Sequence, residues 1–343
     1  MKFSTLLRAL KYLTGVTAAI CVAGLLATLW IYRDIPVEVL EAEYGKPPSQ
    51  FMIIDGVRIH FRDEGDGTTI VLIHGHWGSL FQWDSWIPTL LQNHRVVRFD
   101  LTSHGLTGVD PTGDYTNERA VWLLEQLADR LNLEKFHIAG TSIGGMIAYK
   151  YTAANPDRIL SLGLINSGGL KNPARGPDDR YEMAWWIDAL AYYTPKSVVE
   201  NILRNVAGDP TSISDDVVDQ WYRFNMAEGQ REAEIERNRQ FTIGRTTEEL
   251  NLIRSPTLLM WGESNANLPL SQVDEFKSRL INAPVTTVIY EGIGHNVTYE
   301  NPKESARDYL EFVKQVPADI AALTHIFRRS YSELPEDSFR HKN

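Results

Sequence analysis

The sequence predicts an α/β fold with a mainly parallel sheet, and three features of the chain indicate it. From about residue 50 onward, short apolar runs with the length of buried strands alternate with stretches of helical periodicity. This rhythm is interrupted between Ser167 and about Leu250 by a helix-rich, aromatic segment, and it then resumes. A glycine-flanked serine, Ser142, follows one expected strand and opens the next expected helix. We therefore predict one α/β domain with a helical insertion.

The individual elements follow from the same patterns. Asp55-Gly56 is a strong hairpin turn signal between two short apolar runs. Strands are expected at 51–54, 57–61, 69–73, 96–99, 136–139, 159–165, 256–260 and 286–290. Helices are expected at 117–131, 143–154, 273–280 and 303–313. Aromatic pairs at 185–186, 192–193 and 221–222 lie in the insertion, where helix packing explains most of them.

Composition and pattern together divide the chain of 343 residues. The expected parts are a transmembrane signal-anchor at 1–33, a linker at 34–50, an α/β core at 51–166 and 251–315, a helical cap at 167–250, and a C-terminal helix and tail at 316–343. Hydrophobic residues make up 43% and charged residues 23%, as in packed globular domains. The net charge of −10, without any basic run, gives no reason to expect a nucleic-acid partner.

The N-terminus predicts attachment to a membrane. Tyr12 to Ile31 carries no charge, and a helix of this length reaches about 30 Å, the thickness of the hydrocarbon core. Basic residues precede the stretch and acids follow it, so we expect the catalytic body on the non-cytoplasmic (periplasmic or extracellular) side. The alternatives are a cleaved signal peptide and a soluble helix. The lone Cys21 lies within this stretch, which excludes an intrachain disulfide.

Ser142 is the candidate nucleophile. It stands in Gly140-Thr141-Ser142-Ile143-Gly144, between an expected strand and an expected helix. A serine on such a sharp turn is exposed at the carboxyl end of the sheet, and glycines two residues to either side avoid a collision. The helix that starts at Ile143 favours negative charge developing near its first turn.

A second glycine-rich loop supplies the candidate oxyanion hole. His74-Gly75-His76-Trp77-Gly78 follows an expected strand, so its backbone N–H groups can approach a reacting carbonyl. We expect the N–H groups of His76 and Ile143 to form the hole, and we expect His74 to be structural. Two histidines one residue apart, without a third ligand at a clear spacing, do not indicate a metal site.

His295 is the candidate base. It lies in Gly292-Ile293-Gly294-His295, a glycine-rich loop after the last expected strand. A histidine there can take the proton of a serine hydroxyl and later give it to the leaving group. The alternative is an ordinary surface-loop histidine.

Taken in order, these motifs resemble the α/β-hydrolase superfamily over about residues 50 to 315. The resemblance rests on the His74 loop, on 99–101 with 104–108, on the Ser142 turn and on Gly294-His295. It implies an α/β-hydrolase fold with an eight-stranded sheet, in which the insertion covers the site as a cap. A serine nucleophile places the chain nearest to the esterase, lipase and C–C hydrolase branch.

The acid of the implied Ser-His-acid triad is missing from its usual place. The resemblance puts it three residues after the glycine of a Trp-Gly pair, and Trp261-Gly262 places Asn265 there. The other family position for the acid also holds an amide, Asn166. Three interpretations stay open: Glu263 replaces the acid, Asn265 orients His295 through its carbonyl oxygen, or the chain is a weak or inactive enzyme that binds a ligand.

The function expected from these residues is hydrolysis by an acyl-enzyme mechanism of the carboxylesterase or lipase type. We expect the ester of a moderately apolar small molecule or lipid as substrate, with the membrane as the other partner. Cleavage of a C–C bond next to a carbonyl is an alternative, as is ligand binding without turnover. No cofactor is expected, because water is the second substrate.

Overall fold

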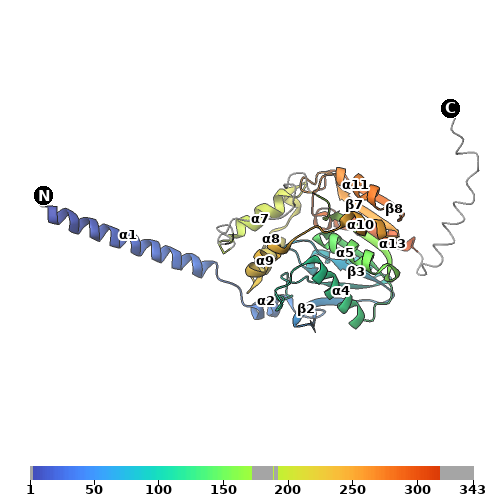
Figure 1. Ribbon diagram of the computed structural model, residues 1–343, viewed down its shortest axis with the longest axis horizontal. Helices are drawn as coiled ribbons and strands as arrows, with labels where there is room; N and C mark the ends of the chain where they lie inside the picture. The colour runs from blue at the N-terminus through green and yellow to red at the C-terminus, as the bar shows by residue number, and fades with distance from the viewer. Residues whose placement is uncertain (1–2, 172–187, 189–191, 317–343) are drawn as a thin grey trace, which may run out of the picture.

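The computed structural model describes residues 3–171, 188 and 192–316, and it contains one eight-stranded sheet (Figure 1). The strands are β1 Gln50–Ile54, β2 Val57–Glu64, β3 Thr68–Ile73, β4 His94–Phe99, β5 Phe136–Ser142, β6 Ile159–Ser167, β7 Thr257–Gly262 and β8 Val285–Tyr290. Their order is β1-β2-β4-β3-β5-β6-β7-β8. The β1–β2 and β2–β4 pairs are antiparallel and every other pair is parallel, so the predicted fold class is confirmed.

Helices cover both faces of this sheet, and others form the N-terminal extension and the insertion between β6 and β7. The longer ones are α1 Phe3–Ile31, α2 Val37–Tyr44, α4 Asn117–Arg130, α5 Ile143–Ala154, α7 Lys196–Asn205, α8 Asp215–Asn225, α9 Gln230–Gln240, α10 Thr246–Leu252, α11 Ser271–Arg279 and α13 Pro302–Lys314. The short ones are η1 Leu80–Trp83, α3 Ile87–Leu90, η2 Pro156–Arg158, η3 Pro210–Ser212 and α12 Val297–Glu300. Helices α7, α8 and α9 lie together at the end of the body nearest α1 (Figure 1).

The strand alternation explains the two layers of core. In β3, Val71 and Ile73 belong to the apolar cluster that contains side chains of α4, α5 and α11. Ile70 and Leu72 belong instead to the cluster that contains α3 and α13. Successive residues of a strand point to opposite faces, so a strand buried on both sides reads as one continuous apolar run. This is the pattern from which the sequence predicts buried strands.

Local signals predict most of these elements correctly, but they miss α2 and several short helices. The Asp55-Gly56 turn joins β1 to β2 in register Ile54↔Val57, and α5 spans the expected 143–154. The segment expected as a linker at 34–50 contains α2, whose Leu40 is fully buried. The insertion contributes α7, α8, α9 and α10. The expected C-terminal helix and tail lie outside the described residues from 317 onward, as do Trp185 and Trp186.

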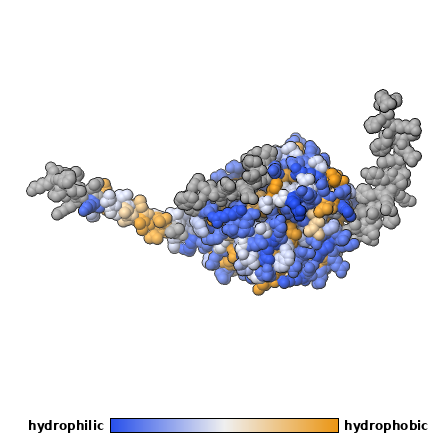
Figure 2. Space-filling view, in the orientation of Figure 1, coloured by the Kyte–Doolittle hydropathy of each residue, from blue (hydrophilic) through white to orange (hydrophobic). Residues whose placement is uncertain are grey.

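Helix α1 extends away from the body (Figure 1). Its residues from 11 to 27 are all exposed. Its window Lys11–Thr28 has a mean hydropathy of 1.4, and none of it is buried. Figure 2 shows an apolar band on this helix beside a largely hydrophilic body. One helix of the described chain is therefore long and apolar enough to cross a membrane.

Candidate active site

Ser142 occupies a strained turn between β5 and α5. Its backbone has φ +53° and ψ −120°, a left-handed conformation that serine rarely adopts. A Cβ added at Gly140 would strike the carbonyl group of Gly144, and one added at Gly144 would strike the carbonyl oxygens of Ile73 and His74. The turn therefore needs glycine at both flanking positions, as the sequence pattern predicts.

The His74–Gly78 loop lies directly against this serine. A Cβ built on Gly75 would be 3.4 Å from the Cβ of Ser142, which is close van der Waals contact. Ile143 begins α5 immediately after the serine, so its N–H belongs to the positive end of that helix. The two backbone segments expected to form an oxyanion hole thus flank the same hydroxyl-bearing residue.

His74 has a structural role, as expected. Its side chain is fully buried, and its Nδ1 donates to the carbonyl oxygen of Gly75 at 2.7 Å. Its Nε2 accepts the backbone N–H of Leu101 at 3.0 Å. Burial lowers the pKa of this imidazole, so it stays neutral. Among the described residues, no group of three or more possible metal-ligating side chains is present.

Helix α9, in the insertion between β6 and β7, holds the next two residues of the loop. Glu234 Oε1 lies 2.8 Å from Nε2 of His76 and accepts the indole N–H of Trp77 at 3.1 Å. From α8, the Asn225 amide donates to the carbonyl oxygen of Trp77 at 3.2 Å. Trp77 has φ +62°, an unfavourable conformation for a bulky residue, and these contacts hold it there. Glu234 is 157 residues from Trp77, which is why sequence spacing does not reveal it.

A buried cation lies beside this contact. Arg237 of α9 is only 8% exposed and forms an ion pair with Glu234. Burial lowers the pKa of its guanidinium to about 9. Burial, and then the charge of Arg237, lower the pKa of His104, whose ring lies 5.0 Å from that of His74. The Arg237–Glu234 ion pair therefore lies near two imidazoles, those of His74 and His104, whose pKa is lowered.

The loop that carries His295 is fixed on both sides. Glu300 accepts the N–H groups of Gly294 and Asn296, each at 2.8 Å. The backbone N–H of His295 itself donates to Val206, at the end of α7, at 2.7 Å. The imidazole is half-buried, and this desolvation lowers its pKa to about 4. His295 is therefore a neutral, pre-positioned ring and not a mobile surface side chain.

Asn166 ties the His295 loop to the strand next to Ser142. Its buried amide nitrogen donates to the carbonyl oxygens of Gly294 and His295, at 3.0 and 2.8 Å. Its oxygen accepts the N–H of Gly262 at 3.1 Å. The next residue, Ser167, is the register partner of Ser142. Asn166 thus bonds the backbone of the histidine loop, a role that the sequence does not indicate.

Asn265 is the residue that meets the ring of His295. It is 2% exposed, and its Oδ1 accepts the backbone N–H groups of Asn267 and Leu268, at 3.2 and 3.1 Å. Only an oxygen can accept both, so the amide nitrogen takes the other position, 3.1 Å from Nδ1 of His295. The interpretation in which the carbonyl oxygen of Asn265 orients His295 is therefore wrong.

Glu263, the other candidate for the acid, is directed elsewhere. Its side chain is exposed, and its carboxylate accepts the backbone N–H of Gly292 at 3.4 Å. The structure therefore brings Asn265 to the imidazole, and it places Glu263 at the rim of the same loop.

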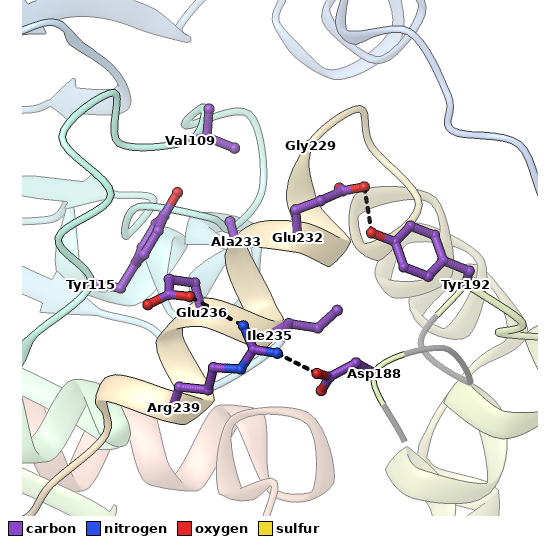
Figure 3. A pocket seen from close by; sticks show the side chains of 10 residues that line it. All are labelled: Val109, Tyr115, Asp188, Tyr192, Gly229, Glu232, Ala233, Ile235, Glu236 and Arg239. Atoms are coloured by element: carbon purple, nitrogen blue, oxygen red, sulfur yellow. Dashed lines mark hydrogen bonds and ion pairs between the residues drawn. The ribbon is translucent and has the colours of Figure 1, made fainter. Parts of the chain in front are cut away.

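A separate cleft lies along α9 (Figure 3). It has a volume of about 620 Å³. Its lining is Val109, Tyr115, Asp188, Tyr192, Gly229, Glu232, Ala233, Ile235, Glu236 and Arg239. Ser142 and His295 are not among these residues, so the cleft is not the candidate catalytic centre.

The family model described as the alpha/beta hydrolase fold matches residues 68–302, which span the strand before the His74 loop through the His295 loop. The chain belongs to the alpha/beta hydrolase family. This assignment covers well over half of its length and agrees with the sheet order described above.

The curated relatives of the chain have names that describe different activities. It is 25% identical over 254 residues to the dihydrolipoyllysine-residue acetyltransferase component of an acetoin cleaving system from Pseudomonas putida, over 73% of this chain and 64% of that one. It is 26% identical to monoacylglycerol lipase abhd6-A from Xenopus laevis, over 74% of this chain and 77% of the relative. The family and its lipase relatives support a hydrolase.

Solved structures confirm the fold. A putative lipase from Acinetobacter baumannii superposes with a TM-score of 0.68 at 24% identity, over 82% of this chain and 97% of that structure. At this level of identity the similarity shows the architecture alone.

Proposed function

We propose that this protein is a membrane-anchored serine hydrolase that cleaves the ester of a moderately apolar small molecule or lipid. The strained turn at Ser142 carries the proposal, because a side chain held at φ +53° between two obligatory glycines is an arrangement built for a nucleophile. Ser142 Oγ would attack the acyl carbon, and the N–H groups of His76 and Ile143 would bind the oxyanion. Water then hydrolyses the acyl-enzyme.

The base in this proposal is His295, and Asn265 makes it a poor one. An amide NH2 group only donates, so Nδ1 of His295 must accept, and the neutral ring carries its proton on Nε2. A general base needs a free lone pair on the nitrogen that faces the serine. The other tautomer, with the proton on Nδ1, leaves Nε2 free but sets the Nδ1–H against the amide NH2 group. This tautomer is therefore the minor one, and we expect slow turnover through it.

The apolar helix α1 supports the membrane part of the proposal. Basic residues before the apolar stretch and acids after it orient the catalytic body to the non-cytoplasmic side. The monoacylglycerol lipase relative supports a lipid ester as the substrate class.

Labelling with a fluorophosphonate probe tests the nucleophile. We expect the folded full-length chain to be labelled and Ser142→Ala to abolish labelling. Hydrolysis of p-nitrophenyl acetate and butyrate, measured for the same two proteins, then tests turnover. A folded protein that neither reacts with the probe nor hydrolyses either ester would contradict the proposal.

A ligand-binding protein without turnover is the second candidate, and the amide nitrogen at His295 is the observation that favours it. Ester hydrolysis by the parent and by Ser142→Ala distinguishes the binding protein from the hydrolase. A binding protein shows the same residual ester hydrolysis with Ser142 as with Ser142→Ala, whereas a slow hydrolase loses its activity in the variant.

A further inference from the structure

The chain that leaves α1 is fixed to the cap within a few residues. Ile35 forms a parallel bridge with Ala227, in the connection between α8 and α9. Its N–H donates to Met226 at 2.7 Å, and its carbonyl oxygen accepts the N–H of Glu228 at 3.0 Å. The preceding residue, Asp34, forms an ion pair with Arg231, which is 8% exposed.

Helix α2 extends this attachment along the body. Leu40 is fully buried in a cluster with Leu80, Phe81, Leu106, Phe224 and Ala227. The ring of Tyr44 lies 4.9 Å from that of Phe224 in α8. Glu43 pairs with Arg223 of the same helix at 2.6 Å. The attachment is therefore an apolar and ionic contact over residues 34–44, with no slack chain in it.

This attachment limits how far the cap can lie from the end of α1. Ile35 follows Ile31, the last residue of the helix, by four residue-to-residue steps, with three residues between them. An extended chain rises at most about 3.5 Å per step, so these four steps span about 14 Å at most. If α1 crosses a bilayer, the α8–α9 connection lies at the level of the lipid headgroups.

The cap surface at this level has the character of a membrane interface. The ring of Tyr193 lies 4.8 Å from that of Tyr32 at the end of α1, and Tyr193 is 51% exposed. Tyrosines gather where an apolar region meets water at a bilayer surface. One side of the neighbouring helix α7 carries only uncharged exposed residues: Ser197, Val198, Asn201, Ile202 and Asn205. The charged side chains of this helix are held in ion pairs, Lys196 with Asp219 of α8 and Glu200 with Arg204.

The apolar side of α7 that faces the body is buried against α8. Val199 and Leu203 are buried against Val218 and Trp221 of α8. Val198 and Ile202, four residues apart on the other side, are each 41% exposed. By contrast, the exposed residues of α8 include Asp215, Asp216 and Asp219, which suit water and not lipid.

We infer that the cap surface formed by Tyr193 and the uncharged side of α7 rests on the lipid bilayer, held there by the contact of residues 34–44 with the cap. This inference rests on the proposed membrane anchor. It assigns to the cap a second contact with the membrane, independent of the span itself. Because α8 is acidic beside this surface, zwitterionic phosphatidylcholine is the appropriate bilayer for its test.

Fluorescence quenching in phosphatidylcholine vesicles tests the inference on the full-length chain. An environment-sensitive dye on the native Cys21 reports the span, because this is the only cysteine of the chain and it is exposed. In a Cys21→Ser background, Val198→Cys and Ile202→Cys place the dye on α7. Ile281→Cys, at a position 66% exposed after α11, is the matched control.

We expect dyes at 21, 198 and 202 to shift to shorter wavelength and to lose emission to doxyl-labelled lipids, and the dye at 281 to do neither. Asp34→Lys, which sets a cation against Arg231, should reduce quenching at 198 and leave it unchanged at 21. Asp66→Lys, the same charge change at an exposed acid in the β2–β3 turn, should leave both unchanged.

Each result that differs from this expectation overturns a specific part of the inference. Quenching at 21 without quenching at 198 and 202 overturns the docking surface and leaves the anchor standing. Equal quenching at 198 and 281 also overturns it, because the contact would then be nonspecific. A dye at 21 that stays in water overturns the anchor and, with it, the docking surface.

Discussion

The amide nitrogen of Asn265 lies 3.1 Å from Nδ1 of His295, at the place where a triad would present a carboxylate. The surroundings of Asn265 suit a carboxylate at least as well as they suit the amide. Its oxygen already accepts two backbone N–H groups, and a second oxygen in place of the nitrogen would accept Nδ1–H of the histidine. In the proposed triad, the amide nitrogen at this position therefore reverses the polarity of the hydrogen bond to His295.

Asn265→Asp should raise the turnover number for p-nitrophenyl butyrate by about 10²- to 10⁴-fold, because the carboxylate restores the tautomer that can accept the proton of Ser142. The rate of fluorophosphonate labelling should rise in parallel. Steady-state kinetics and labelling time courses on the purified full-length protein measure both.

Glu263→Gln is the control for this change. Its side chain is exposed and bonds the N–H of Gly292, so we expect turnover within about twofold of the parent. A large loss of activity in Asn265→Asp, with none in Glu263→Gln, would show that the amide itself is required and that the tautomer argument is mistaken.

The pH dependence of turnover should change with the same substitution. A general base must be neutral, so activity is lost as the pH falls below the pKa of His295. With that pKa near 4, the parent should keep a constant rate down to about pH 5. In Asn265→Asp the nearby carboxylate favours the imidazolium, so the acidic limb should move to higher pH. Identical limbs in the two proteins would contradict the assignment of His295 as base.

Local sequence signals are sufficient for the elements that carry the site. The Asp55-Gly56 turn, the helix from Ile143 to Ala154 and the glycines around Ser142 act through neighbours in sequence, so their patterns can be interpreted directly. The pattern ends β5 too early, at residue 139, because Gly140-Thr141-Ser142 has the composition of a turn. In the structure the ladder with β6 continues to Ser142.

What the sequence cannot supply are contacts between distant segments. Asn166 contacts residues 128 and 129 positions away, and Glu234 contacts Trp77 across 157 positions. Helix α2 escapes prediction because a single fully buried side chain, Leu40, leaves little amphipathic pattern in eight residues. The identity of Asn265 is evident from sequence, but the direction of its amide depends on the two backbone N–H groups that fix its oxygen.

Glu234→Gln should lower both stability and turnover. It leaves the buried guanidinium of Arg237 without its carboxylate and weakens the contact that holds Trp77 at positive φ. We expect the free energy of unfolding to fall by about 1 to 3 kcal/mol, less than for a fully buried pair because Glu234 is 19% exposed. Turnover at temperatures where the variant is folded should fall about tenfold.

Glu236→Gln is the matched control on the same helix. Glu236 lies on the cleft side of α9, where it pairs with the exposed Arg239 at 3.5 Å (Figure 3). Urea unfolding and ester kinetics should show little change for this variant. Equal losses in both variants would mean that α9 tolerates no neutral residue at either position, and that Glu234 has no particular effect on the loop.

Asn166→Asp should have the opposite outcome to Asn265→Asp, although both replace a buried amide with an acid near His295. At 166 the amide nitrogen donates to two carbonyl oxygens, so a carboxylate oxygen there would meet two acceptors. We expect the free energy of unfolding to fall by about 3 kcal/mol or more and labelling of Ser142 to be lost.

The pH dependence of that loss follows from the sign of the shift. Facing two carbonyl oxygens, the carboxyl group introduced by Asn166→Asp would be more stable protonated, so its pKa in the folded state would lie above the unfolded value of about 3.9. The folded state then binds more protons, and stability should decrease as the pH rises from about 4. Asn282→Asp, which changes one exposed amide–carbonyl bond, is the control and should show a much smaller loss. Urea unfolding at pH 4 and pH 7 distinguishes the two, and an Asn166→Asp protein that is equally stable at both would contradict the assigned direction of the Asn166 amide.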